Sequence, residues 1–157
     1  MTTDTIVNKG RAVEILLVED NFGDVILTKK AFKNAKLANN ITVAEDGSKA
    51  LAILRREGEY RYAPIPDIVL LDLNLPKKSG QDVLKEIKSD ENLRKIPVVI
   101  LTSSRAELDV VKSYNLYANS YIVKPVSLEK FIDVVKTVEQ FWFMVAVLTD
   151  DLNKDAG

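Results

Sequence analysis

Residues 68–76 read IVLLDLNLP, an apolar run that ends on Asp72. The run Ile68–Leu71 contains only Ile, Val and Leu, which is typical of a strand buried on both faces of a parallel sheet. Other short runs along the chain have a similar composition, and together they make five candidate strands. The runs are Val13–Val18, Ile41–Ala44, Ile68–Leu71, Val98–Leu101 and Tyr121–Val123.

The segments between these runs carry apolar residues at helical spacing. In Asp24–Lys36, the residues Leu27, Ala31 and Ala35 recur every four positions, which predicts that this face packs on the sheet. Further helices are expected at Ser48–Arg56, Gln81–Lys88, Ala106–Tyr114 and Ser127–Leu148, with Ser127 as the N-cap of the last. Alternating strands and helices predict a doubly wound, flavodoxin-like (βα)5 parallel sheet of strand order 2-1-3-4-5 with an extended C-terminal helix.

The composition of the 157-residue chain suits one globular domain. We expect that domain at 12–149, between a flexible N-terminus at 1–11 and a flexible C-terminal tail at 150–157. The 22 basic and 23 acidic residues nearly cancel, so nothing suggests a nucleic-acid partner. The chain has no cysteine and no histidine, which excludes disulfides, thiol catalysis, imidazole metal sites and a phosphohistidine on this chain.

Membrane association is not expected from the sequence. The N-terminus has no apolar signal-peptide region, and the longest strongly apolar run, Phe141–Leu148, is far shorter than the ~20 residues a transmembrane helix needs. A cytoplasmic protein is therefore predicted.

Chemically versatile side chains follow four of the five runs. Glu19 and Asp20 follow the first run, Asp72 the third, Thr102 the fourth and Lys124 the fifth. Because the carboxyl ends of parallel strands meet at one edge of a sheet, we expect these side chains to converge. Three neighbouring carboxylates repel one another unless a cation lies among them, and ligation by oxygen alone suits Mg²⁺. Asp72 would then be a carboxylate nucleophile for a phosphoryl group, with Lys124 and Thr102 contacting its oxygens.

These residues stand in four ordered motifs that resemble the receiver domains of bacterial response regulators in two-component signalling. The motifs are LVEDN at 17–21, LLDLNLP at 70–76 with Gly80, LTS at 101–103 and YIVKP at 121–125. The resemblance covers Val13 to about Thr149. Within the family, the chain is most similar to the single-domain regulators that partner cyanobacterial phytochromes, although many of those have Pro where this chain has Phe22.

The resemblance implies a phosphoacceptor and a metal site. Asp72 would be phosphorylated, and it would share a Mg²⁺ ion with Asp20 as a direct ligand and with Glu19, which often acts through water. Asn74 would add its backbone carbonyl to the metal. The phosphoryl donor would be a partner histidine kinase, with a bacterial phytochrome as a candidate.

The resemblance also implies a switch. Thr102 would be the switch hydroxyl and Tyr121 the switch aromatic, although Tyr121 also suits an ordinary core position. Lys124 would contact the phosphoryl group, and the Lys124–Pro125 peptide bond would be cis.

Two other functions fit parts of the pattern. Magnesium-dependent phosphatases of similar fold also place an Asp nucleophile after a strand, but many carry a second Asp two residues later as a general acid. Here that position is Asn74, which cannot transfer a proton in that role. A phosphorylation-independent adaptor would not require the intact acceptor, acid pair, hydroxyl and lysine. We therefore expect a signalling protein whose catalysis extends no further than its own phosphorylation and dephosphorylation.

The last predicted helix carries more apolar residues than one face can bury. Its predicted core-facing stripe is Phe131, Val134, Val135, Val138, Trp142 and Val145. The residues off that stripe are Phe141, Phe143, Met144, Val147 and Leu148. A contiguous exposed apolar patch marks a contact site, so we predict a homodimer through this helix. The alternative is a longer helix that folds back on its own domain.

Overall fold

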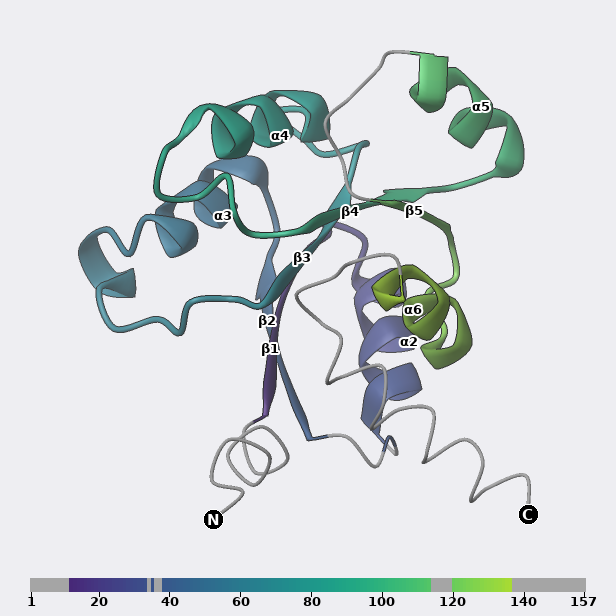
Figure 1. Ribbon diagram of the computed structural model, residues 1–157, viewed down its shortest axis with the longest axis horizontal. Coiled ribbons are helices and arrows are strands. Elements are labelled where there is room, and N and C mark those ends of the chain that lie inside the picture. The colour runs from purple at the N-terminus through teal and green to yellow at the C-terminus, as the bar shows by residue number, and fades with distance from the viewer. Residues whose placement is uncertain (1–11, 34, 36–37, 114–119, 137–157) are drawn as a thin grey trace.

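The computed structural model describes residues 12–33, 35, 38–113 and 120–136. A five-stranded parallel sheet of order β2-β1-β3-β4-β5 forms its middle layer (Figure 1). The strands are β1 (Val13–Val18), β2 (Asn39–Ala44), β3 (Ile68–Asp72), β4 (Val98–Thr102) and β5 (Ser120–Val123). The helices are α2 (Phe22–Lys33), α3 (Gly47–Leu54), α4 (Gly80–Ser89), α5 (Arg105–Ser113) and α6 (Leu128–Val135), with a 3-10 turn η1 at Gly58–Tyr60. The predicted doubly wound fold and strand order are confirmed.

Helices cover both faces of the sheet. Figure 1 shows α3 and α4 on one side and α2 and α6 on the other. Within β1, Ile15 and Leu17 belong to the core under α2 and α6, whereas Leu16 and Val18 belong to the core under α3 and α4. Because β3 and β4 are buried on both faces, they read as unbroken apolar runs rather than alternating ones, whereas the edge strands β2 and β5 are only partly buried.

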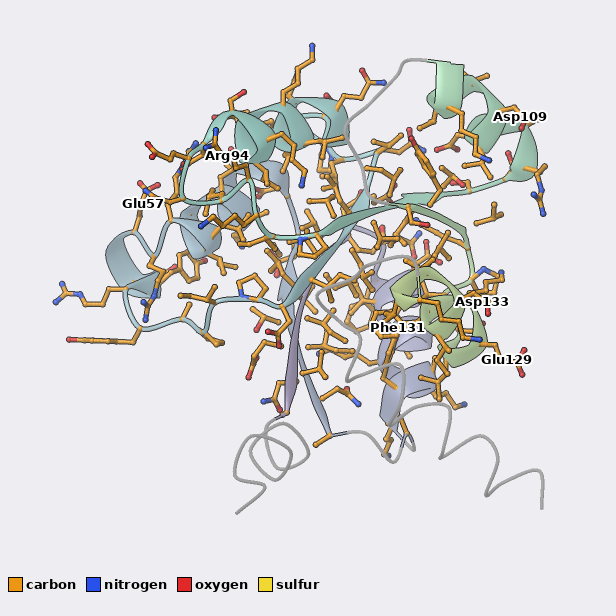
Figure 2. All side chains as sticks on the ribbon, viewed as in Figure 1. Glu57, Arg94, Asp109, Glu129, Phe131 and Asp133 are labelled. Carbon is orange, nitrogen blue, oxygen red and sulfur yellow. The ribbon has the colours of Figure 1, made fainter. Side chains whose placement is uncertain are left out.

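An aromatic pair joins the two helices of the α2 and α6 layer. The rings of Phe32 and Phe131 meet edge to face, with centroids 4.9 Å apart and planes at 84°. Figure 2 shows the charged side chains of Glu129 and Asp133 on the outer side of α6, where both residues are exposed. The amphipathic pattern predicted for this helix therefore holds over its described part.

The buried face of α2 matches the predicted one only in part, since Ala31 packs against the core but Leu27 does not. Leu27 is 52% exposed, and the buried residues are Val25, Thr28 and Phe32. The Thr28 hydroxyl donates to the Asp24 carbonyl (2.9 Å), so this polar side chain can be buried without leaving a donor unsatisfied. Because Thr28 is polar, the spacing of apolar residues alone does not predict the face formed by Val25, Thr28 and Phe32.

Side-chain caps set where the helices begin and shape the loops at the strand ends. The Ser127 hydroxyl accepts from the Lys130 amide (3.2 Å), which confirms the predicted N-cap of α6. Equivalent caps are Asn21 for α2, Asp46 for α3, Ser79 for α4 and Ser104 for α5.

Residues 137–157 and 1–11 lie outside the described part of the chain. The extension of the last helix to Leu148, the predicted dimer residues and the predicted domain ends are therefore untested by the structure and stay predictions. None of the helices in the described residues is long and apolar enough to cross a membrane.

Candidate functional site

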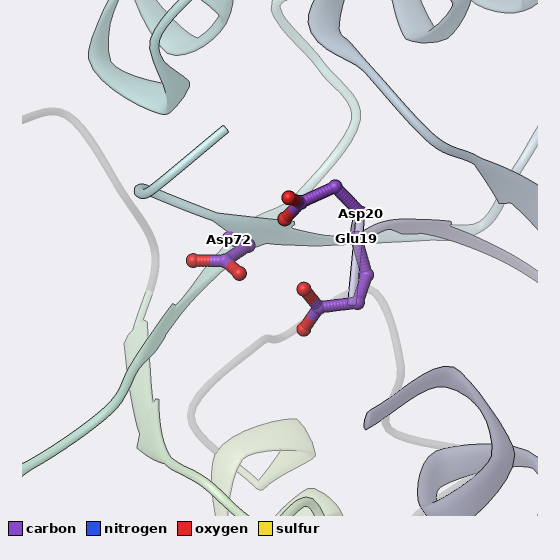
Figure 3. Close-up of side chains that lie close together, drawn as sticks. All are labelled: Glu19, Asp20 and Asp72. Carbon is purple, nitrogen blue, oxygen red and sulfur yellow. The ribbon is translucent and has the colours of Figure 1, made fainter. Parts of the chain in front are cut away.

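Three carboxylates meet at the carboxyl edge of the sheet. Glu19 and Asp20 directly follow β1, and Asp72 ends β3. One carboxylate oxygen from each lies within 4.8 Å of the others, and Figure 3 shows the three side chains gathered there. Glu19 and Asp72 are buried while Asp20 is exposed. This set fits a hard divalent cation, because it offers oxygen ligands on one side and leaves the solvent side open for water.

Lys124 lies among acidic side chains at the end of β5. Its Nζ is 2.7 Å from Glu19 Oε1, 2.8 Å from Asp72 Oδ2 and 3.0 Å from Asp24 Oδ2. The Lys124 amide also donates to the Thr102 carbonyl (2.8 Å), which holds the strand end beside β4. The Lys124–Pro125 peptide bond is cis. The Lys124 side chain is only 13% exposed, so these contacts lie in a poorly solvated environment.

The pKa values of the three contacting groups reflect this environment. Burial raises the pKa of the Glu19 carboxyl to about 7, helped by the neighbouring Asp72 and opposed by Lys124. Burial also pushes the pKa of Asp72 upward, but hydrogen bonds with Glu19, Lys124 and the Asn74 amide outweigh it and leave that pKa lowered. Burial would lower the pKa of Lys124, but Asp72, Glu19 and Asp24 together raise it. Asp72 is therefore an ionised carboxylate facing a charged ammonium.

Thr102 has a buried, unpaired hydroxyl at the end of β4, the strand next to that of Asp72. The residue ends β4 and is fully buried, and within the described residues its Oγ1 is a buried side-chain atom without a hydrogen-bond partner. A buried hydroxyl without a partner is unfavourable, so such a group in a native protein calls for an explanation. An oxygen-rich group bound at Asp72 would supply the missing partner, since Asp72 pairs with Leu101 in the adjacent strand.

The backbone after Asp72 is held tightly. The Asn74 amide donates to Asp72 Oδ1 (2.9 Å), and the Gly80 amide donates to the Leu73 carbonyl (3.1 Å). A Cβ on Gly80 would lie 2.5 Å from the Leu73 Cα and would collide with the Asp72 carbonyl oxygen. Only glycine lets α4 begin this close to the acceptor strand.

Tyr121 lies in β5, half-buried. It packs against the core under α3 and α4, and the Lys112 ammonium is 5.9 Å from its ring centroid. This half-buried position agrees with the ordinary core position that the sequence also suggested for Tyr121. The role of Tyr121 as a switch aromatic stays a prediction.

Two residues of the site were missed by the sequence analysis. Asp24, in the first turn of α2, contacts Lys124, and Glu107, in the first turn of α5, accepts from the Asn74 side-chain amide (2.9 Å). A sequence signal existed for Glu107, because Ser104 and Glu107 have the spacing of a capping box. Asp24 had no comparable signal beyond its place one turn after Asp20.

Comparison with known families identifies the class of protein that this fold and site define. The family model described as the response regulator receiver domain matches residues 15–136. The chain therefore belongs to the response regulator receiver family of two-component signalling proteins. Receivers of this family use a divalent metal ion, which agrees with the chemistry of the carboxylate cluster.

Phytochrome response regulators are prominent among the similar proteins. Response regulator Rcp1 of Synechocystis sp. is 42% identical over 134 residues, which is 85% of this chain and 91% of Rcp1. The bacteriophytochrome response regulator AtBRR is 46% identical, with a TM-score of 0.78 over 84% of this chain and 96% of AtBRR. The phosphorylated cyanobacterial phytochrome response regulator RcpA is 47% identical, with a TM-score of 0.68 over 84% and 94%. A solved structure of Rcp1 contains Mn²⁺; it is 43% identical, with a TM-score of 0.66 over 83% and 94%.

Proposed function

We propose that this protein is a response regulator in which Asp72 accepts a phosphoryl group from a histidine kinase. The observation that carries the proposal is the position of Lys124, whose ammonium contacts both Asp72 and Glu19 and whose backbone amide donates to the carbonyl of Thr102, a residue with an unpaired hydroxyl. A carboxylate, an ammonium and a free hydroxyl are the groups that an acyl phosphate needs: a nucleophile, a cation and a donor for its oxygens.

The acidic cluster would hold Mg²⁺ through Glu19, Asp20 and Asp72, with the backbone carbonyl of Asn74 as a further ligand. The separation of their oxygens and the exposure of Asp20 support this assignment. When bound, the ion would neutralise charge that develops on the phosphoryl oxygens.

The protein side chains perform the rest of the transfer. The chain has no histidine, so the phosphohistidine belongs to the partner. An Asp72 oxygen forms a bond to phosphorus as the phosphorus–nitrogen bond of the donor breaks, and the imidazole leaves with the bonding pair and takes up a proton. Lys124 stays charged and can move from the Asp72 carboxylate to a phosphoryl oxygen, while Thr102 donates its hydroxyl hydrogen to another. Self-hydrolysis of the acyl phosphate would end the signal, and no other catalysis is assigned to this chain.

The similarity to the phytochrome response regulators RcpA and AtBRR supports a phytochrome as the donor kinase, and we propose the cytoplasm as the location. We propose that the signal leaves by protein–protein contact and that the protein forms a homodimer through its C-terminal helix. Sedimentation at micromolar concentration tests the dimer, because a double variant with Phe143→Glu and Leu148→Glu should be monomeric while the wild type is not. A monomeric wild type would contradict the dimer.

Intact mass after incubation with acetyl phosphate and Mg²⁺ tests the proposed function. The wild type should gain one phosphoryl group, and Asp72→Asn and an EDTA-treated wild type should not. A donor consumed without an adduct would instead indicate a phosphatase. A wild type that neither gains mass nor consumes the donor would indicate an adaptor that works without phosphorylation.

A further inference from the structure

Glu107 links the two loops that flank the proposed acceptor site. Its Oε1 accepts from the Asn74 side-chain amide (2.9 Å), and its Oε2 accepts from the Ser103 backbone amide (3.3 Å). Its own backbone amide donates to Ser104 Oγ (3.1 Å), which anchors the residue in the first turn of α5. One carboxylate thus bridges the loop after β3 and the loop after β4.

Both residues that the Glu107 carboxylate contacts, Asn74 and Ser103, lie next to residues of the proposed phosphoacceptor site. Asn74 is shared, because its backbone amide donates to Asp72 Oδ1 (2.9 Å) while its side chain donates to Glu107. Ser103 directly follows Thr102, whose hydroxyl is the unpaired donor of the site. Asp72 also pairs with Leu101 in β4, and Asn74 is the one residue that contacts both Asp72 and Glu107 in the described part of the chain.

We propose that Glu107 is a positioning residue that locks these two loops together while Asp72 is unphosphorylated, and that phosphorylation releases the lock. This inference rests on the proposed function. A phosphoryl group brings further negative charge to Asp72. Asp72 and Glu107 both accept hydrogen bonds from Asn74, so the added charge on Asp72 repels the Glu107 carboxylate. Glu107 is half-exposed, so it can turn into solvent, whereas the acceptor is buried. Release of Glu107 would free the start of α5 and the Ser103 amide from the loop after β3.

Charge and hydrogen bonding can be separated by two variants. Glu107→Gln keeps an oxygen that accepts from Asn74 but removes the charge, and Glu107→Ala removes both. Asp109→Asn is the matched control, because it removes the same charge from the same helix at an exposed position (Figure 2). All variants are compared after thermal melts show that they are folded.

The first readout is the ratio of phosphorylated to unphosphorylated protein with acetyl phosphate and Mg²⁺. In this reaction an Asp72 oxygen replaces acetate on phosphorus. Glu107→Gln should raise the ratio on the order of threefold at low ionic strength, with the gain shrinking in ~1 M salt as screening removes the repulsion. Asp109→Asn should change the ratio of phosphorylated to unphosphorylated protein by clearly less. Equal effects of Glu107→Gln and Asp109→Asn would overturn the inference while leaving the proposed function intact.

The second readout is the NMR signal of the Asn74 side-chain amide. Asn74 contacts Asp72 and so shifts on phosphorylation in any case, but only release from Glu107 moves its signal toward that of Glu107→Ala. In the wild type the signal should shift on phosphorylation toward its position in unphosphorylated Glu107→Ala. An unchanged Asn74 signal in a fully phosphorylated wild type would overturn the release. A wild type that takes up no phosphoryl group would overturn the proposed function itself, and this inference with it.

Discussion

Replacing Lys124 with Met removes the cation that contacts three carboxylates at the carboxyl edge of the sheet. The methionine keeps most of the apolar stem, so the change isolates the charge. Two of the three partners, Glu19 and Asp72, have side chains only 1% and 4% exposed. The variant therefore leaves two neighbouring buried acids without their shared counter-charge.

The expected cost follows from this geometry. Breaking a buried ion pair by removing one partner costs ~3–5 kcal/mol, because the remaining charge is left desolvated and unpaired. The site borders solvent at the exposed Asp20, and Asp24 is a third exposed, so we expect the low end, a loss of about 3 kcal/mol of unfolding free energy. That is a large part of the ~5–15 kcal/mol typical of a folded domain.

Saturating Mg²⁺ should bring the unfolding free energy of the variant close to that of the metal-free wild type. Mg²⁺ would bind the same buried carboxylates that Lys124 contacts, Glu19 and Asp72, so the variant should bind Mg²⁺ at least as tightly as the wild type. A ligand at 100 times its Kd adds ~2.7 kcal/mol to stability. The variant should nevertheless accept phosphoryl groups poorly, because it lacks the ammonium that would contact their oxygens.

Urea unfolding in EDTA and in saturating Mg²⁺ measures both effects, with intact mass after acetyl phosphate as the functional readout. Lys29→Met is the matched control, since Lys29 is exposed on α2, and it should stay within ~0.5 kcal/mol of the wild type in both buffers. A Lys124→Met protein as stable as the wild type in EDTA would show that the ammonium does not stabilise the buried acids. A smaller gain in unfolding free energy on adding Mg²⁺ for the variant than for the wild type would contradict the expected metal binding.

Three further substitutions probe the metal ligands, the hydroxyl and the backbone of the site. Asp20→Ala should weaken Mg²⁺ binding by roughly tenfold or more without unfolding the protein, because Asp20 is an exposed ligand in the proposed set; an unchanged Kd in calorimetry would contradict that assignment. Thr102→Val should leave the urea midpoint equal or higher, since it removes a buried hydroxyl without a partner, yet it should slow phosphoryl uptake; an undiminished uptake rate would show that the hydroxyl has no role. Gly80→Ala should destabilise by ~1–3 kcal/mol because its Cβ meets the backbone after Asp72, whereas a merely helical position would gain from alanine; a more stable variant in urea unfolding would show that α4 can move away.

The central strands follow from local sequence, and the strand order follows from the right-handed crossovers expected of alternating strands and helices. β3 and β4 are buried along their whole length, so burial alone produces their unbroken apolar runs, and β1 begins and ends where the sequence predicted. The convergence of Glu19, Asp20, Asp72 and Lys124 also follows, because parallel strands bring their carboxyl ends to one edge. The family match over residues 15–136 agrees with the four motifs found in order along the chain.

The residues at the edge of the sheet could therefore be predicted from the sequence, whereas their pairing depends on how the helices pack on the strands. The buried face of α2 depends on how that helix crosses the sheet, and the satisfied hydroxyl of Thr28 concealed it from any count of apolar residues. Asp24 and Glu107 matter only because their helices pack beside strands far away in sequence, with Lys124 and Asn74 as their partners. Apolar patterning records burial, which is a property of each segment, whereas an ion pair or a bridging carboxylate depends on distances of about 3 Å between segments that only packing brings together.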